Sequence, residues 1–483
     1  MRRGMLFLAA AAIAIAPAAA QGPRFLNPRD VAQAHREHAA IVEEMGGPET
    51  GHRVAYVESV GRRVGAYSGV ANPGQALHFT TLNSAVENAM SVPGGYVYIT
   101  RQLLTIMDDE AQLGFALGHE VAHIAANHAR ARQAYAQRNN VWGVLGAILG
   151  GVFGGVGNVF GQMAQQRAQL ATLSFSRDQE YQADTLATRY LVAAGYDPAG
   201  GPGILAALAR SSALQARVQG RTNRQTPEWA STHPLSVNRA QRALADARAT
   251  GRLGTGLRNR DQFLAQLEGL FVDDDPAQGV IEGPTFTHPV LRIQFTVPQG
   301  YLMQNGTDAV TVSGSAGKAQ FRGGRGTIDD AILAAYRQLT DGRVNFPIPP
   351  AQRTVVNGIP AAVTTARVQT SSGYVDASVF AYQWDQARVY YFVMVTQGGY
   401  GIQPFASMVN SLRRITPQEA AAIRPRVIQI RTVAPGDTVQ SLASRMAYRD
   451  FRLERFLSLN NLAANSRLVP GQKVKLVVYG RRG

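Results

Sequence analysis

The segment from residue 109 to residue 128 constrains this chain more than any other, because it combines a helical pattern with two histidines on one face. Acidic residues at 108–110 precede apolar residues at helical spacing, and no proline interrupts the segment. His119 and His123 are four residues apart, so on a helix their Cβ atoms lie about 5–6 Å apart. Two neutral imidazoles at this separation can bind one zinc ion at about 2.0–2.1 Å, with Glu120 beside a water molecule on the metal.

A third ligand is needed, because H-E-x-x-H can also arise by chance on an ordinary amphipathic helix. Catalytic zinc usually has three protein ligands, and the chain contains no cysteine, so the third must be His, Asp or Glu. Glu180 and Asp184 lie four residues apart in a second helical segment, 176–195. Glu180 can bind the metal while Asp184 accepts a hydrogen bond from a ligating histidine. A solvated acidic helix face is the alternative.

Four motifs in order give the chain a family resemblance. The two helices, with Asn-Ala-Met-Ser-Val-Pro-Gly-Gly-Tyr (88–96) before them and Ser-Thr-His-Pro (231–234) after them, resemble the gluzincin metallopeptidases of the CAAX-protease, HtpX and BepA type. The resemblance implies zinc as cofactor, one ion per chain. By position it implies the ligands His119, His123 and Glu180, the general base Glu120, and a supporting residue, Asp184.

The resemblance also places His233 near the metal. In relatives the matching histidine can occupy the fourth zinc position and hold the enzyme latent, and Pro234 biases His233 toward the extended conformation of a loop. Alternatively, His233 and Arg239 stabilise the oxyanion formed during attack. His128 lies five residues beyond His123, well round the helix, so we expect it to belong to the surface or to packing.

The N-terminus has the pattern of an export signal. Two arginines precede an apolar run at 5–16 and the small residues Ala18 to Ala20, so residues 1–20 are predicted to be a signal peptide. A membrane anchor is the alternative, although the apolar run is short. Together with the family, this pattern predicts a periplasmic protein. The net charge of +15 comes from scattered arginines, which indicate no nucleic-acid partner.

An uncharged, glycine-rich stretch at 141–160 separates the two ligand-bearing helices. It is long enough to span a bilayer, but a single crossing would put His123 and Glu180 on opposite sides of the membrane. We therefore expect a mobile apolar lid or a membrane contact, with a plain buried loop as the alternative.

The pattern of the chain predicts a multidomain fold. Residues 21–255 are predicted to form a mainly α zincin-like metallopeptidase domain with a small β-sheet, in which 76–81 and 96–100 are strands joined across the Pro-Gly-Gly turn. Residues 95–99 are placed to pair with substrate as an edge strand, and an ordinary packed strand is the alternative. Residues 256–280 are predicted to be a linker. Residues 281–420 are predicted to form an α+β domain, weakly similar to Mog/PsbP-like modules.

The tail, residues 428–478, resembles a LysM module with a βααβ order, on the basis of its Pro-Gly-Asp-Thr turn, paired asparagines and Pro-Gly-Gln turn. In that family such modules bind N-acetylglucosamine-containing glycans, which here implies peptidoglycan. A LysM fold that serves only as a structural cap is the alternative.

These features together predict a periplasmic zinc endopeptidase that hydrolyses misfolded or unassembled envelope proteins. Glu120 would take a proton from the attacking water and pass it to the leaving amine. The competing hypotheses are a chaperone-like or wall-binding protein with a latent zinc site, and a hydrolase of peptidoglycan peptides.

Overall fold

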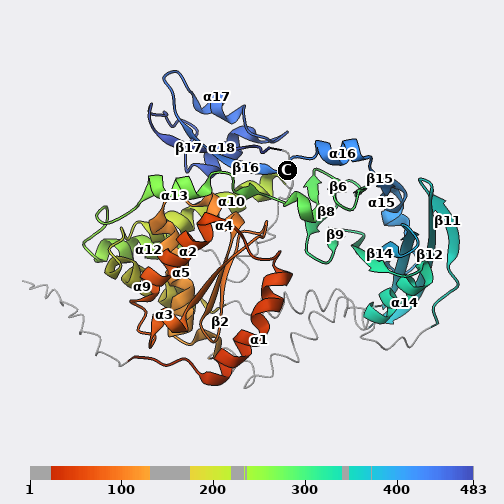
Figure 1. Ribbon diagram of the computed structural model, residues 1–483, viewed down its shortest axis with the longest axis horizontal. Helices are drawn as coiled ribbons and strands as arrows, with labels where there is room; N and C mark the ends of the chain where they lie inside the picture. Colours follow the sequence, from red (N-terminus) through yellow and green to blue (C-terminus); the bar gives the residue numbers. More distant parts are fainter. Residues whose placement is uncertain are drawn as a thin grey trace, which may run out of the picture.

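The computed structural model describes residues 23–130, 175–218, 233, 237–339, 347–370 and 373–481 (Figure 1). The predicted signal peptide at 1–20 and the apolar stretch at 141–160 lie outside these residues. Within the described ranges, no helix is both long enough and apolar enough to cross a membrane.

The N-terminal domain is mainly helical, as the sequence predicts. Helix α5 crosses its centre and packs against α2, α9 and α10, and nearly all of its side chains are buried. Both ligand-bearing helices begin at a capping residue, Asp109 for α5 and Ser176 for α9, which accepts a hydrogen bond from a backbone N–H of the first turn. The helices of this domain are α1 (Pro28–Glu44), α2 (His52–Gly65), α3 (Pro73–Ala76), α4 (Arg101–Ile106), α5 (Glu110–Ala125), α9 (Arg177–Ala193), α10 (Gly200–Val218) and α12 (Val237–Ala249).

The sheet of this domain differs from the prediction in one respect. Its described strands run in the order β1 (His78–Leu82), β3 (Tyr96–Thr100), β2 (Ala89–Val92), with β1 parallel and β2 antiparallel to β3. The Pro-Gly-Gly turn therefore joins β2 to β3, and β3 is a packed central strand, so the interpretation of 95–99 as an edge strand is wrong. The edge that faces α5 is β2, whose short alternating pattern escaped the sequence analysis.

Both glycines of that turn are required by their surroundings. Gly94 and Gly95 have φ values of 102° and 98°. A Cβ atom on Gly95 would lie 1.9 Å from the Ala76 carbonyl oxygen, and one on Gly94 would lie 2.6 Å from that of Asp30. The turn thus lies in close contact with the first turn of α1 and with the end of α3, and these contacts fix the position of β2.

Residues 256–280, predicted to be a linker, are folded. They contain α13 (Arg260–Leu267), β4 (Phe271–Val272) and the 3-10 turn η1 (Pro276–Gln278). The guanidinium of Arg101, which is 1% exposed, donates to the carbonyl oxygens of Phe271 and Asp273. Polar composition indicated a solvated linker, but the buried arginine on α4 satisfies this backbone and fixes it to the N-terminal domain.

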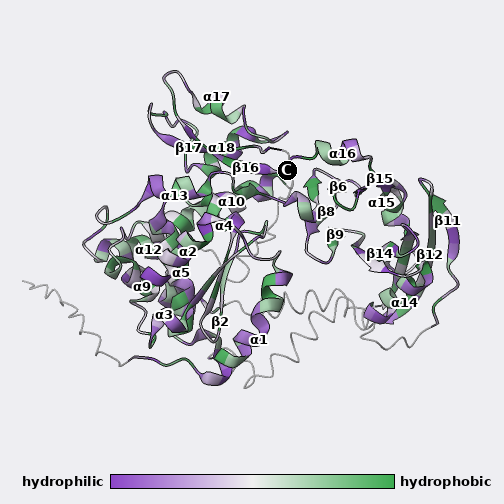
Figure 2. Ribbon diagram, viewed as in Figure 1, coloured by the Kyte–Doolittle hydropathy of each residue, from purple (hydrophilic) through white to green (hydrophobic). Residues whose placement is uncertain are grey.

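The α+β domain contains two antiparallel sheets among its described residues. The larger has the order β11-β12-β13-β14-β10-β9-β8, with α14 (Ile328–Leu339) packed on β13 and β14, and the smaller has the order β15-β7-β6-β5. Helix α14 shows hydrophobic and hydrophilic segments in Figure 2, as expected for a helix with one face on a sheet. The strands are β5 (Val280–Glu282), β6 (Thr285–His288), β7 (Ile293–Thr296), β8 (Leu302–Asn305), β9 (Val310–Gly314), β10 (Gly317–Arg325), β11 (Gln352–Val356), β12 (Ile359–Thr370), β13 (Gly373–Gln383), β14 (Arg388–Gln397) and β15 (Arg413–Arg414).

Three short helical segments follow β14 or β15, namely η2 (Gln403–Phe405), α15 (Ala406–Ser411) and α16 (Pro417–Ala422). The chain then enters the C-terminal module, which we define as residues 426–479. Its order is β16 (Arg426–Thr432), α17 (Val439–Ala443), α18 (Arg452–Leu459) and β17 (Lys473–Tyr479), the predicted βααβ arrangement. Strand β4 pairs with β16, so the sheet of the module continues into residues 271–272.

Candidate metal centre

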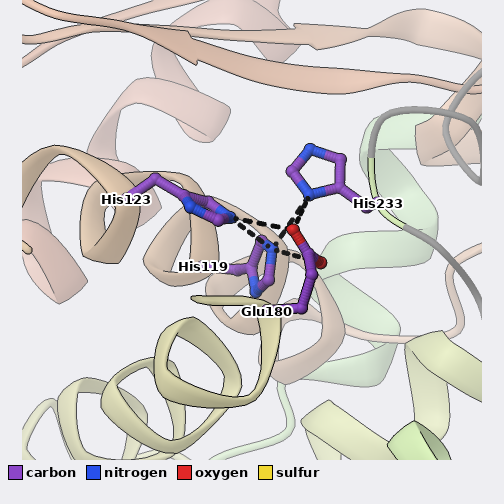
Figure 3. A group of neighbouring side chains, drawn as sticks. All are labelled: His119, His123, Glu180 and His233. Carbon is purple, nitrogen blue, oxygen red and sulfur yellow. Dashed lines mark hydrogen bonds and ion pairs between the residues drawn. The ribbon is translucent and has the colours of Figure 1, made fainter. Parts of the chain in front are cut away.

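Four side chains from three separate parts of the chain meet at the centre of the N-terminal domain (Figure 3). His119 and His123 come from α5, Glu180 comes from α9, and His233 comes from the segment before α12. All four are at most 3% exposed. The structure thus brings together the three predicted ligands and the histidine whose role the sequence left open.

The donor atoms of these residues have the spacing of ligands around one ion. His119 Nε2 lies 3.0 Å from His123 Nε2, 3.3 Å from His233 Nδ1 and 3.5 Å from Glu180 Oε2. A tetrahedral zinc ion with bonds of about 2.0–2.1 Å holds its ligand atoms about 3.3 Å apart. Without a cation, the lone pairs of these nitrogens and oxygens would face one another in a buried site. The residues therefore fit a zinc ion.

Asp184 and Arg239 form a second layer behind the donors. Asp184 Oδ1 lies 2.9 Å from His119 Nδ1, the ring nitrogen that points away from the donor cluster. Arg239, on α12 and 1% exposed, donates to both Asp184 oxygens at 2.7 and 2.8 Å and lies 2.7 Å from Glu180 Oε2. These contacts place its guanidinium behind Glu180, and its alternative role beside an oxyanion stays a prediction.

His123 has two neighbours that the sequence analysis missed. His128 Nδ1 lies 2.9 Å from His123 Nδ1, and its Nε2 lies 3.0 Å from Gln182 Oε1. Helix α5 ends at Ala125, and Asn127 takes a left-handed conformation (φ 57°), which turns the chain back toward the site. His128 is therefore buried beside His123 and is not on the surface. The ring of Phe175 stacks on His123 with 3.7 Å between the ring centroids.

Glu120 faces the site from the same helix as the two histidines. Its Oε2 accepts a hydrogen bond of 3.0 Å from the hydroxyl of Ser91 on β2, and its Oε1 lies 3.4 Å from His233 Nε2. Ser91 belongs to the Asn-Ala-Met-Ser motif, but its role depends on the position of β2, which local pattern does not reveal. The edge strand thus orients the carboxylate that was predicted to be the general base.

Charges around the site set its protonation in the metal-free protein. Burial lowers the pKa of His119, but hydrogen bonds to Asp184 and Glu180 outweigh burial and raise it to about 9. Burial and the charge of His119 hold the pKa of His123 well below its usual value. Although burial raises the pKa of Glu180, His233, His119 and Arg239 lower it well below its usual range. A neutral His123 and an ionised Glu180 are the forms that bind zinc.

A cavity of about 570 Å³ opens beside the donors. Ser91 and Val92 of β2, Ile124 of α5, His123 and Phe175 contribute to its walls. Because β2 has a neighbour on only one side among the described strands, the cavity lies along an available strand edge.

Comparison with known proteins identifies this domain. Residues 51–247 match the model of peptidase family M48. This region is therefore similar to peptidase family M48, and we call residues 51–247 the M48 domain. The match includes every donor of the cluster together with Glu120, Asp184 and Arg239, and the family uses zinc as its metal. The M48 domain is therefore a zinc metallopeptidase domain. Residues 432–477 match the LysM domain model, which confirms the resemblance of the tail.

Three relatives each match less than half of this chain. Beta-barrel assembly-enhancing protease of Escherichia coli O157:H7 is 31% identical over 209 residues, and that of Yersinia pestis is 32% identical over 198 residues. Each match covers 40% of this chain and 38% of the relative. Mitochondrial metalloendopeptidase OMA1 of Arabidopsis thaliana is 27% identical over 33% of this chain and 29% of its own length. The chain thus spans less than two fifths of the length of these relatives.

Solved structures add little to the identification. A crystal structure from Bacteroides thetaiotaomicron has a TM-score of 0.24 at 10% identity and covers 41% of this chain and 87% of its own. The solution structure of cyanobacterial PsbP from Synechocystis sp. PCC 6803 has a TM-score of 0.23 at 10% identity and covers 28% of this chain and 98% of its own. The predicted similarity of the α+β domain to Mog/PsbP-like modules stays a prediction.

Proposed function

We propose that the protein is a periplasmic zinc metalloendopeptidase that hydrolyses peptide bonds in misfolded or unassembled envelope proteins. The observation that carries the proposal is the convergence of His119, His123 and Glu180 on one point with Glu120 beside it. Three protein ligands and a neighbouring carboxylate are the requirements of a hydrolytic zinc site.

Each residue of the site has a distinct role in the proposed hydrolysis. When bound, zinc polarises the scissile carbonyl group and lowers the pKa of a water molecule. Glu120 accepts a proton from the attacking water and donates it to the leaving amine. Ser91 holds Glu120 in place, and Asp184 keeps the proton of His119 on Nδ1, so that Nε2 presents its lone pair.

The edge strand and the cavity support a peptide as substrate. An extended peptide can add to the available edge of β2 through main-chain hydrogen bonds, with its scissile bond next to Glu120. The adjacent cavity of about 570 Å³ has room for at least one large side chain. Main-chain hydrogen bonds do not depend on the side chains of the substrate, and they require an extended segment. This arrangement therefore suits unfolded proteins.

His233 supports a latent state of this site. Its Nδ1 lies 3.0 Å from Glu180 Oε1 and 3.3 Å from His119 Nε2, which is the spacing of a fourth ligand. A ring at this position excludes the water that Glu120 must activate, so hydrolysis requires the ring to move. We propose that Arg239 positions Asp184 and Glu180 and does not contact the substrate.

Substrate class and location rest on the relatives and on the tail. The bacterial relatives are named as proteases that enhance β-barrel assembly, which supports envelope proteins as substrates here. The LysM match supports binding to peptidoglycan through residues 428–478. The predicted signal peptide supports export, and membrane contact through 141–160 stays a prediction.

A comparison of three substrates tests the proposal. Purified zinc-loaded protein should cleave casein and an unfolded outer-membrane protein, and Glu120→Gln should keep its zinc but lose cleavage. The control is Glu58→Gln, an exposed glutamate on α2 that should leave the rate unchanged. Cleavage of sacculi alone would favour a hydrolase of peptidoglycan peptides. Binding of unfolded protein without cleavage, also after His233→Ala, would favour a chaperone-like protein.

A further inference from the structure

The C-terminal module shares one hydrophobic core with the M48 domain. Helix α18 packs on α10 and α4, and strand β16 contacts α13 (Figure 1). The shared core combines residues of both parts, among them Leu104, Met107, Leu208, Phe456 and Leu476. Strand pairing between β4 and β16 adds backbone hydrogen bonds to this contact. A module that moved as a tether would expose this apolar surface to water.

At the centre of this interface lies a fully buried lysine. Lys475, on β17, is 0% exposed, and burial lowers its pKa to about 8, an effect that Asp108 partly offsets. Its Nζ donates to the carbonyl oxygens of Thr105 and Met107 at 2.9 and 2.6 Å and lies 3.4 Å from Asp108 Oδ1. A buried ammonium group without partners would be strongly destabilising, so these contacts determine how β17 docks.

The backbone of Lys475 is held as firmly as its side chain. Asn460, at the end of α18, accepts a hydrogen bond of 2.7 Å from the Lys475 N–H and donates one of 2.9 Å to the Lys475 carbonyl oxygen. Asn460 is 5% exposed. The position of the ammonium group is therefore set by the fold of the module.

All partners of the Lys475 side chain lie in or next to one short turn. Residues 107–109 join α4 to α5, and Asp109 caps α5 through a hydrogen bond to the Gln112 N–H. The carbonyl groups at the end of α4 carry partial negative charge, which favours a cation there. His119 lies ten residues after Asp109, about 15 Å along a rigid helix. A displacement of the turn would therefore move His119, Glu120 and His123 together.

We infer that Lys475 is a positioning residue for the catalytic helix, and that the C-terminal module is a fixed structural part of the peptidase. The inference rests on the proposed peptidase function for its effect on turnover, but its structural part does not. The sequence left open that the LysM fold serves only as a structural cap. The inference goes further, because it names Lys475 as the contact through which the module stabilises the catalytic helix. Glycan binding by the module would then hold the active site in a fixed orientation to the wall.

The test compares two lysines on the same strand in the full-length, zinc-loaded protein. Lys475→Met removes the charge and keeps most of the side-chain volume. Lys473→Met is the control, because Lys473 is 36% exposed and pairs with Asp261 at the surface. We expect Lys475→Met to speed hydrogen exchange of amides 105–113 with little change elsewhere, and to lower kcat by about 10- to 100-fold with KM unchanged. The visible spectrum of the Co²⁺-substituted protein should change as well.

Each other outcome is informative. Wild-type exchange at 105–113 and a wild-type Co²⁺ spectrum in Lys475→Met would overturn the inference, as would equal effects in Lys473→Met. If Lys475→Met does not fold, Asn460→Ala keeps the buried charge and loosens its backbone, and the same local exchange is expected. If the wild-type protein cleaves nothing, the proposed function fails, while exchange and the Co²⁺ spectrum still decide the positioning role.

Discussion

Glu87 allows a quantitative test of the interface between the M48 domain and the C-terminal module. It lies between β1 and β2, is 7% exposed, and accepts a hydrogen bond of 2.6 Å from the Ser211 hydroxyl. Glu87 also lines a cavity of about 140 Å³, whose walls include Met446, Tyr448 and Leu459 of the module. Burial raises the pKa of Glu87 to about 7, although Ser211 opposes the change.

The pH dependence of stability follows from this pKa. Between pH 4.5 and 7 the folded protein keeps a proton that the unfolded chain has released, so the free energy of unfolding falls as the pH rises through this range. The difference between a pKa of about 7 and one of 4.5 corresponds to about 3 kcal/mol, at about 1.4 kcal/mol per pKa unit. Glu87→Gln is neutral at every pH and avoids this loss.

Urea unfolding of zinc-saturated protein at pH 5 and pH 8 measures the effect. Relative to the wild-type protein, Glu87→Gln should gain about 2 to 3 kcal/mol more at pH 8 than at pH 5, because a small part of the effect is already present at pH 5. Glu58→Gln, on the exposed side of α2, should show no such difference. The difference in free energy of unfolding between variant and wild-type protein is taken at each pH. This difference cancels contributions that both proteins share, including that of zinc binding. An equal effect of Glu87→Gln at both pH values would show that water solvates the carboxyl group, and would refute the calculation.

Three further predictions concern the metal centre. His233→Ala should raise basal hydrolysis while zinc stays bound, because the ring no longer fills the fourth position; a zinc-loaded, folded variant that is slower than its parent would indicate transition-state stabilisation instead. Glu180→Ala should weaken zinc binding more than the loss of a residue behind a ligand does, which typically costs about 10- to 100-fold in affinity. Competition with a chelator measures the zinc affinity, and wild-type affinity would mean that another residue is the third ligand. Ser91→Ala should lower kcat by up to about tenfold, equivalent to about 1.4 kcal/mol, with zinc affinity unchanged; unchanged turnover would show that β2 does not orient Glu120.

The parts of the site that follow from helical spacing could be predicted from the sequence. His119 and His123 share a face because they are four residues apart, and Glu180 and Asp184 do so for the same reason. His128 is buried in packing, one of the two outcomes expected for it, but its contact with His123 was not foreseen because the α5 pattern was continued past Ala125, although an asparagine at 127 is a common helix end. Ser91 could not be found locally, because its contact depends on the order of strands in the sheet.

The linker prediction failed for a related reason. Aspartates and glycines at 250–279 indicate solvated chain, but the partner that buries this segment, Arg101, lies about 170 residues earlier. A pattern read within one window cannot include a partner at that distance. The same holds for Lys475, which is fully buried against the carbonyl groups of Thr105 and Met107, about 370 residues earlier in the chain.

Part of the positive charge of the chain lies at contacts between segments and not on an open basic surface. Arg101 donates to backbone carbonyl groups at 271 and 273, Arg53 donates to those of Gln266 and Glu268, and Lys475 donates to those at 105 and 107. In each case a cation on one segment satisfies carbonyl groups of a segment far away in the sequence, and Arg53 also pairs with Glu49 at 2.7 Å. Such contacts add to net charge without forming a basic surface. Part of the charge of +15 therefore serves to join the M48 domain, residues 256–280 and the C-terminal module into one body.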